Sequence, residues 1–383
     1  MDIKIDDIVK QVLSEVNTVS VRPTVPVVKK EAAFTGNEKG KTAVLVSPEE
    51  YEIKEYELPK IGGKEILVRV EGCMVSPADT AEFMKEKRIG QAAVLGLEGT
   101  GTVVKVGSAG LQDAKGNSLK VGDHVVAVKK ARGAVSSYRG NTVNAGVTAN
   151  GWFSNYVVLQ AGNQVYQVNG LDQESRLLTE TVLAVNSVIE RTAKLHKLDC
   201  AKRVLVMGCG LEGLITMAIL KCRGVDQIIA LDGDVNALKL AGEFGAKEVI
   251  NYREKNGASG VQEKVKKYFG GNMADVVFQC ISSTMGRGAA KRFLKSGGYV
   301  CELGHVLGRG KATTKYYDET MPIGGRFYSA KDYEECFELL EKAAQKRIPM
   351  YKLVTHRFSL QEINEAHWTA VREEGMGIAV FNR

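Results

Sequence analysis

The fold is decided by the stretch RVLVMGCGLEGLITMAILKC at residues 203–222. Val204–Met207 are an apolar run of strand length, the pattern GxGxxG follows at residues 208–213, and an apolar helical segment runs on from Leu214. Glycines in this pattern permit a tight turn and a close pass of the backbone to a pyrophosphate, which the free N–H groups of the helix N-terminus then face. The stretch therefore predicts a dinucleotide site at Gly208, Gly210 and Gly213.

An acidic residue follows at the expected distance from this loop. Asp232 ends the next apolar run, IIALD, nineteen residues after Gly213. A carboxylate at that place accepts hydrogen bonds from the adenosine ribose hydroxyls and repels a 2′-phosphate, so we predict NAD rather than NADP. The alternative is a nucleotide-binding fold that has lost its cofactor.

The periodicity on either side of the loop predicts an α/β protein of two domains. Five short apolar strands separated by helical stretches, RVLVMG, QIIALD, EVINY, DVVFQC and GYVCELG, indicate a doubly wound parallel sheet. From Thr42 onward, Val-rich runs bounded by Gly, Pro and Asp are typical of a barrel-like antiparallel domain. A length of 383 residues also favours about two domains.

Composition excludes several classes of function. No apolar run reaches the roughly 18 residues of a membrane span. The net charge of +7 is scattered rather than clustered, so we expect no nucleic-acid partner. The seven cysteines form no CxxC or CxxH pair, which argues against a disulfide framework and a compact zinc lobe. With no secretory signal, the chain is predicted to be cytoplasmic.

The N-terminus carries an amphipathic pattern of its own. Residues 1–16 place apolar side chains, Ile8, Val12 and Val16 among them, along one stripe of a helix. Residues 17–41 contain Pro and Gly without a sustained period and are expected to form a linker. A helix this short is marginal alone and must dock on a partner or on its own globular body.

From about Thr42 to the C-terminus the chain resembles the medium-chain dehydrogenase/reductase superfamily, in its zinc-type alcohol dehydrogenase-like branch. The resemblance is carried by LGLEGTGTVVKVGS (95–108), VGDHVV (121–126), GWFSNYVVL (151–159), RVLVMGCGLEGL (203–214), FGAKEVINY (244–252), ADVVFQC (274–280) and THRFSLQEINEAH (355–367). It implies a GroES-like catalytic domain at 42–187, completed by 330–383, and a Rossmann domain at 188–329. It also implies that Leu211, Glu212, Ile281 and Leu303 help to bind NAD, and that the protein is a homodimer or homotetramer.

The chain departs from the zinc-dependent members of that superfamily. Ser76 stands where they carry a metal-binding cysteine, Leu97 where they carry a histidine ligand, and residues 127–150 contain none of the cysteines of the structural zinc loop. Glu180 matches a carboxylate ligand of some members, but a carboxylate with a serine hydroxyl is a poor zinc site. We therefore expect an enzyme without a metal. The turn at residues 76–79 is similar to that of zinc-independent quinone and enoyl reductases.

Four residues are the candidates for catalysis without zinc. Ser76, Glu98 and Glu180 lie near the expected cleft by analogy, and a donor there could stabilise the developing oxyanion. For Ser76 a turn hydroxyl is an equal alternative, and Glu98, like Asp79, is better explained by a structural or supporting role. His305 follows a predicted strand at its C-terminal end, where Rossmann ligands bind, and is favoured over the other four histidines.

Residues 1–16 and the linker resemble the encapsulation peptides that target enzymes into bacterial microcompartments. This resemblance implies shell proteins as partners, a location in the microcompartment lumen, and a short aldehyde or its alcohol as the substrate. The leading hypothesis is an NAD(H)-dependent, zinc-independent oxidoreductase that interconverts a small aldehyde or ketone and its alcohol. The alternatives are a reductase of an enone, quinone or enoyl double bond, and a noncatalytic nucleotide-binding scaffold protein.

Overall fold

The computed structural model describes residues 34–85, 94–127, 151–160, 165–196, 202–254, 257–281, 289–303, 328–372 and 375–382. The chain divides into two compact units, residues 1–38 and 39–383. In the described part of the first unit, the Glu38 carboxylate accepts hydrogen bonds from the N–H groups of Thr35 (2.7 Å) and Gly36 (2.8 Å). The predicted helix at 1–16 lies outside the described residues, whereas the end of the predicted linker overlaps a strand that begins at Lys39.

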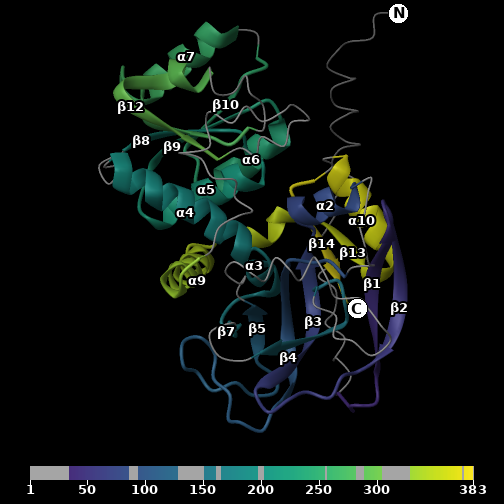
Figure 1. The fold of residues 1–383 in the computed structure, drawn as a ribbon. Helices are drawn as coiled ribbons and strands as arrows, with labels where there is room; N and C mark the ends of the chain where they lie inside the picture. Colours follow the sequence, from purple (N-terminus) through teal and green to yellow (C-terminus); the bar gives the residue numbers. More distant parts are fainter. Residues whose placement is uncertain are drawn as a thin grey trace, which may run out of the picture. The chain divides into compact units, whose positions relative to one another are not determined.

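β-Strands predominate in residues 39–167 of the second unit (Figure 1). An antiparallel hairpin is formed by β1 (Lys39–Ser47) and β2 (Glu50–Glu57). A seven-stranded sheet has the order β13-β14-β3-β4-β5-β7, with β6 paired to β3. Its strands are β3 (Glu65–Met74), β4 (Glu98–Val106), β5 (His124–Ala127), β6 (Tyr156–Gln160), β7 (Val165–Gln167), β13 (Val354–Ser359) and β14 (Gly377–Phe381). Apart from the parallel pair β13–β14, neighbouring strands of this sheet are antiparallel.

The end of the chain takes part in this first sheet. Val380 of β14 pairs with Cys73 of β3, so strands more than 270 residues apart in the sequence are neighbours. Val380 and Cys73 are both buried within one apolar cluster, which also contains Phe83, Phe153 and Ile363. The burial of this cluster is the main force that holds the C-terminal segment against the N-terminal strands.

The second sheet is parallel throughout and has the order β10-β9-β8-β11-β12. Its strands are β8 (Arg203–Met207), β9 (Gln227–Asp232), β10 (Glu248–Asn251), β11 (Ala274–Gln279) and β12 (Leu294–Glu302). These are the five strands that the sequence predicted, and the α/β class with GroES-like and Rossmann portions is confirmed. The chain runs outward from β8 to β10 and then returns to β11 on the other side of β8. Ligands of such sheets bind at the carboxyl ends of the strands beside this reversal.

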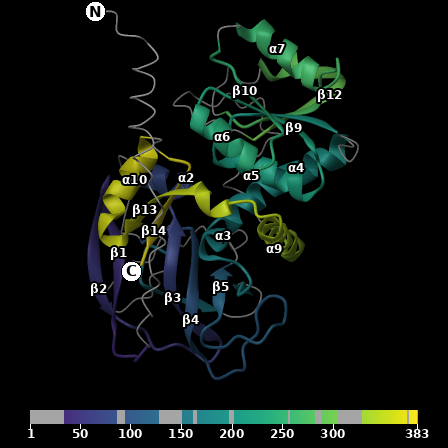
Figure 2. The ribbon, with the colours of Figure 1, turned by 180° about the vertical axis from the view of Figure 1, so that it is seen from behind.

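Helices pack on both sheets and on one another. They are α2 (Pro77–Phe83), α3 (Gln173–Leu177), α4 (Thr179–His196), α5 (Leu211–Cys222), α6 (Val235–Glu243), α7 (Gly257–Tyr268), α9 (Ala330–Gln345) and α10 (Ile363–Val371), with 3-10 turns η3 (Lys291–Phe293), η6 (Met350–Leu353) and η7 (Leu360–Glu362). α4 and α5 lie side by side in both views (Figures 1 and 2). No helix in the described ranges is long and apolar enough to cross a membrane.

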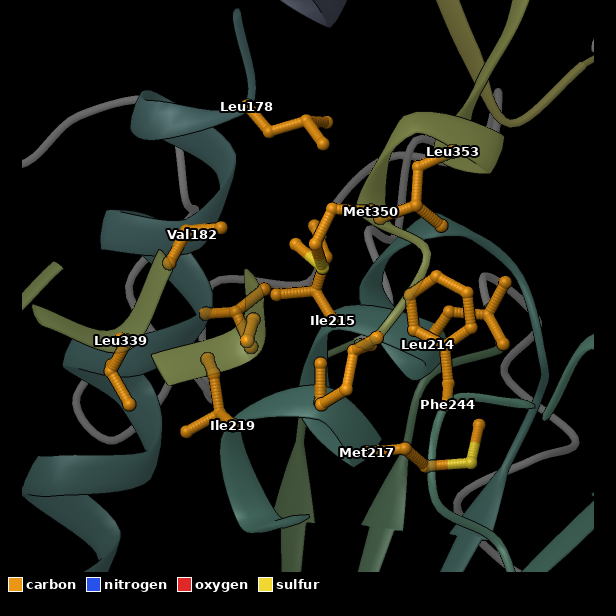
Figure 3. Packing of buried hydrophobic residues seen from close by; sticks show 14 of the residues in the cluster. Leu178, Val182, Leu214, Ile215, Met217, Ile219, Phe244, Leu339, Met350 and Leu353 are labelled. Carbon is orange, nitrogen blue, oxygen red and sulfur yellow. The ribbon is translucent and has the colours of Figure 1, made fainter. Parts of the chain in front are cut away.

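The largest apolar cluster joins α4, α5, α9 and η6. In Figure 3, Val182 of α4, Ile215 of α5, Leu339 of α9 and Met350 of η6 converge on one another. Burying each such side chain contributes about 1.5–3 kcal/mol. This packing fixes the start of α9 against the start of α4, where Glu180 lies, and so positions part of the candidate site.

Two features differ from the sequence-based expectations. α2 forms where only a turn was expected, because Ser76 and Asp79 cap each other reciprocally and Pro77 occupies the first helical position. The three-residue strand β7 was not predicted, since it is too short to show a period. α4 runs across residues 187 and 188, where the predicted boundary between the two domains lies, and that boundary stays a prediction.

Candidate active site

The glycine loop has the geometry that a phosphate site requires. Gly208 has φ +93°, which favours glycine, and a Cβ on Gly213 would overlap the carbonyl oxygen of Gly208. Gly210 precedes the first residue of α5, and a Cβ there would meet no atom within 4 Å. No side chain caps α5, whose first turn begins with Leu211 and Glu212, and a helix N-terminus points its N–H groups toward a bound phosphate.

Asp232 holds the glycine loop through its carboxylate. Oδ2 accepts a hydrogen bond from the N–H of Cys209 (2.7 Å), and Oδ1 accepts from the N–H groups of Gly233 (2.6 Å) and Asp234 (2.9 Å). A carboxylate offers about four acceptor positions, of which these bonds use three. One position on Oδ2 is left for a ribose hydroxyl.

The other predicted cofactor residues lie at the same edge of the sheet. Gly208 and Ile281 follow β8 and β11, and a Cβ on Gly208 would lie 3.0 Å from Cγ1 of Ile281. Leu303 follows β12, is 3% exposed, and donates its backbone N–H to the carbonyl of Gln279 (2.8 Å). The structure thus brings Gly208, Ile281 and Leu303 to the carboxyl ends of three neighbouring strands.

A cation also lies at the expected ribose site, and sequence reasoning missed it. A Cβ on Gly233 would lie 2.6 Å from Nε of Arg253 and 2.7 Å from the hydroxyl of Tyr252. The two side chains contact each other, with the Arg253 guanidinium 5.9 Å from the centre of the Tyr252 ring. Their position after β10 was visible in the sequence, but only the register of β10 with β9 places them beside Gly233.

Ser76 serves as a helix cap in the structure. It is 3% exposed, its hydroxyl donates to Oδ2 of Asp79 (2.6 Å), and the same hydroxyl accepts from the N–H of Asp79 (3.2 Å). The second oxygen of the fully buried Asp79 accepts from the N–H of Gly96 (3.1 Å). Of the two interpretations of Ser76, this geometry favours the turn hydroxyl over a substrate contact.

The charges of Glu98 and Glu180 both act on the phenol of Tyr328, although the two residues come from different parts of the chain. Glu98 opens β4 and pairs with Met74 of β3, while Glu180 lies in the first turn of α4. Burial, and after it the charges of Glu180 and Glu98, raise the pKa of the Tyr328 phenol well above its usual value. Two acids from separate elements therefore influence the same buried phenol.

The histidines divide into distinct environments. His305 lies outside the described residues, so its candidate role stays a prediction. His367 is fully buried among Tyr51, Phe83 and Phe153, and burial lowers its pKa. His124 donates to the buried carboxylate of Glu71 (2.7 Å). His367 is thus a packing histidine, as expected.

Two family models match the chain over more than half of its length. Residues 62–170 match the model described as alcohol dehydrogenase GroES-like domain, and residues 213–342 match the one described as zinc-binding dehydrogenase. The chain belongs to the medium-chain dehydrogenase/reductase superfamily. It is an enzyme of the dehydrogenase type, that is, an oxidoreductase.

Individual members of the superfamily cover nearly the whole chain. A sorbitol dehydrogenase of Arabidopsis thaliana is 26% identical over 90% of this chain and 96% of its own length. An L-threonine 3-dehydrogenase of Symbiobacterium thermophilum is 27% identical over 82% of this chain and 89% of its own. Among solved structures, an alcohol dehydrogenase from Thermotoga maritima has a TM-score of 0.71 at 21% identity and covers 91% of this chain and 100% of its own.

In the described part of this medium-chain dehydrogenase, the donor atoms do not form the set required by the zinc for which the second model is named. Within the described ranges, no group of three or more His, Cys, Asp or Glu side chains is arranged to hold a metal ion. The Ser76 hydroxyl is bonded to Asp79, and Leu97 has no donor atom in its side chain. Zinc in proteins is held by thiolates and imidazoles, with carboxylates as minor partners, so two carboxylates are a poor set.

Proposed function

We propose that the protein is an NAD(H)-dependent, zinc-independent dehydrogenase that interconverts a small aldehyde or ketone and its alcohol. The observation that carries the cofactor assignment is the Asp232 carboxylate, which is bonded to the glycine loop and retains one acceptor position. An alcohol–carbonyl pair is supported by similarity to dehydrogenases named for sorbitol, alcohol and 2R,3R-butanediol.

Different residues of the site would bind different parts of the cofactor. The N–H groups at the start of α5 would bind the pyrophosphate, and Asp232 would bind a ribose hydroxyl. Ile281 and Leu303, at the ends of β11 and β12, lie where the cofactor would run toward the substrate. When bound, NADH supplies a hydride to the carbonyl carbon. The chain must then supply a group that stabilises the charge developing on the carbonyl oxygen.

A substrate panel tests this function. Short aldehydes, ketones, alcohols, enones and quinones are offered to the purified protein with NADH or NAD, and turnover is followed by the nicotinamide absorbance. We expect reduction of at least one aldehyde or ketone, and oxidation of its alcohol. Turnover of enones or quinones alone would establish the double-bond reductase instead. If the protein binds NADH but turns over none of these compounds, the result would favour the noncatalytic scaffold protein.

The zinc content of the purified protein and the effect of a chelator test zinc independence. The protein as purified should contain well under one zinc per chain, and a chelator should change neither its melting temperature nor its turnover. Stoichiometric zinc that survives dialysis, with activity lost on chelation, would contradict this part of the proposal.

We further infer that the enzyme works in the lumen of a bacterial microcompartment, with residues 1–16 binding shell proteins. This rests on the amphipathic stripe and on its resemblance to encapsulation peptides. A homodimer or homotetramer remains the expected assembly. Confinement in such a compartment suits a short, reactive aldehyde as the substrate.

A further inference from the structure

The phenol of Tyr328 is an unexplained polar group in the structure. Its oxygen is buried and makes no hydrogen bond within the described part of the chain. A buried tyrosine hydroxyl ordinarily finds a partner, since leaving it unpaired costs free energy. An unsatisfied buried group in a folded protein calls for an explanation, and a catalytic role is one of those known.

The backbone on the C-terminal side of Tyr328 is well fixed. The next residue, Ser329, caps α9: its N–H donates to Oδ2 of Asp332 (2.7 Å), and its hydroxyl accepts from the N–H of Asp332 (3.3 Å). The Tyr328 ring packs edge-on against Tyr333, with 6.2 Å between ring centres. Tyr333 is itself stacked on Tyr166 of β7 at 5.0 Å. The phenol is therefore held by a capped helix and an aromatic stack, which is the rigid support that a reacting group needs.

The surroundings of the phenol are acidic. Besides burial, the charges of Glu180, Glu98 and Asp332 raise the pKa of Tyr328, so the phenol keeps its proton over the whole physiological range. A neutral phenol among carboxylates is a hydrogen-bond donor, whereas the carboxylates can only accept. The Ser76 hydroxyl is committed to Asp79 (2.6 Å).

We propose that Tyr328 is the catalytic hydrogen-bond donor that binds the carbonyl oxygen of the substrate, in the role that zinc has in metal-dependent dehydrogenases. This assignment rests on the proposed carbonyl reduction. It is carried by the unpaired phenol oxygen, by its fixed backbone, and by the contact of α9 with the start of α4, where Cys336 Sγ donates to the carbonyl of Thr179 (3.5 Å), the neighbour of Glu180.

The reaction involves only NADH, the substrate carbonyl, the Tyr328 hydroxyl and water. As the hydride adds to the carbonyl carbon, the π electron pair moves to the oxygen, and the Tyr328 O–H stabilises the charge that develops there. The resulting alkoxide is a stronger base than a phenolate, so the phenol proton passes to it and an alcohol is formed. A proton from water then restores the phenol. In sum the carbonyl gains one hydride and one proton, and NADH becomes NAD.

Tyr328→Phe tests the assignment because it removes only the hydroxyl. With the best carbonyl substrate of the panel, kcat/KM should fall by about 10²–10³-fold, the usual effect of losing one oxyanion donor. The dissociation constant of NADH should not change, and the melting temperature should hold or rise, because an unpaired buried hydroxyl is removed. Tyr351→Phe is the matched control, because Tyr351 is half exposed on η6 and should tolerate the change.

A binding measurement separates this role from a structural one. Propionamide has a carbonyl oxygen that accepts a hydrogen bond but is not reduced by NADH. It should bind the enzyme–NADH complex of the wild type and bind Tyr328→Phe about tenfold more weakly or worse. Carbonyl turnover by Tyr328→Phe within about twofold of wild type, or equal propionamide binding, would overturn the assignment. A wild type that reduces no carbonyl would instead overturn the proposed function, and the role of Tyr328 with it.

Discussion

Glu71 is the clearest case of a single residue on which part of the fold depends. Its carboxylate is 8% exposed and accepts hydrogen bonds from Arg176 Nη2, His124 Nδ1 (2.7 Å) and Thr102 Oγ1 (2.5 Å). Burial opposes its ionisation, but the hydrogen bond from His124 and the charge of Arg176 outweigh burial and lower the pKa of Glu71 to about 2. The side chain thereby ties β3 to β4, β5 and α3.

We predict that Glu71→Gln destabilises the fold by about 3 kcal/mol at pH 7, because Arg176 is left buried without a counter-charge. The folded-state pKa lies below the ordinary value of 4.5, so the stabilisation is present above pH 4.5 and lost as the pH falls toward 2. Urea unfolding at pH 7 and at pH 3 measures this. The difference in free energy of unfolding between the wild type and Glu71→Gln should be smaller at pH 3 than at pH 7.

Two controls accompany this measurement. Glu57→Gln alters an exposed carboxylate paired with Lys39 at 3.6 Å and should change the stability by less than about 1 kcal/mol. The double variant Glu71→Met/Arg176→Met should recover most of the loss, since it removes both buried charges together. If the difference in free energy of unfolding between wild type and Glu71→Gln is the same at both pH values, the low pKa of Glu71 does not contribute to stability as predicted.

Cofactor choice is also decided at single residues. We predict that the wild type binds NADH much more tightly than NADPH, and that Asp232→Ser narrows this ratio by about tenfold or more, because the charge that repels a 2′-phosphate is removed. Both affinities should fall somewhat, since Asp232 also holds the N–H of Cys209. Fluorescence titration with each cofactor measures the ratio.

A second substitution, at Arg253, adds a further test of cofactor choice. Its guanidinium lies beside Gly233 and could attract the 2′-phosphate once Asp232 is gone, so Asp232→Ser/Arg253→Ala should lose NADPH affinity relative to Asp232→Ser alone. Equal affinity of the wild type for NADH and NADPH would refute the assignment of Asp232. The sequence revealed Asp232 because its distance from the loop is fixed. It did not reveal Arg253, whose place depends on the pairing of β10 with β9.

At the scale of elements, the turn between β8 and α5 contains two glycines with different roles: one is needed for stability and the other for cofactor binding. We predict that Gly213→Ala destabilises the protein by about 1–3 kcal/mol, because its Cβ would overlap the carbonyl oxygen of Gly208. Gly210→Ala should fold normally, since its Cβ would meet no atom within 4 Å, yet lose NADH affinity because that space faces the pyrophosphate. Thermal melts and NADH titration of both variants distinguish these effects. Normal NADH binding by Gly210→Ala would contradict the site.

Elements were predictable where a local pattern decides them. Buried parallel strands are continuous apolar runs, so β8 to β12 were evident from the sequence. α2 was not, because its seven residues show little periodicity and its stability comes from the Ser76–Asp79 cap. Tyr328 gave no signal either, since its importance comes from Glu98 and Glu180, which lie 230 and 148 positions earlier in the chain.

At the scale of the whole molecule, the chain consists of a compact unit at residues 39–383 and a smaller N-terminal unit at residues 1–38. Both family models and the candidate site fall within the larger unit. The smaller unit contains the amphipathic pattern, which that chemistry does not require. Its purpose must therefore be sought in assembly or localisation.

We predict that deletion of residues 1–18 leaves the melting temperature and NADH affinity intact but abolishes association with shell proteins. Replacing Ile8, Val12 and Val16 with charged residues should have the same effect, because the apolar stripe is lost while the length and linker remain. Co-purification with shell proteins measures the association, and replacing Lys10 and Gln11 on the polar face is the matched control. If the helix packs on its own subunit or across an oligomer interface, the deletion would instead lower the melting temperature or change the oligomeric mass. Either change, with shell association unaffected, would refute targeting and remove the main reason to expect an aldehyde substrate.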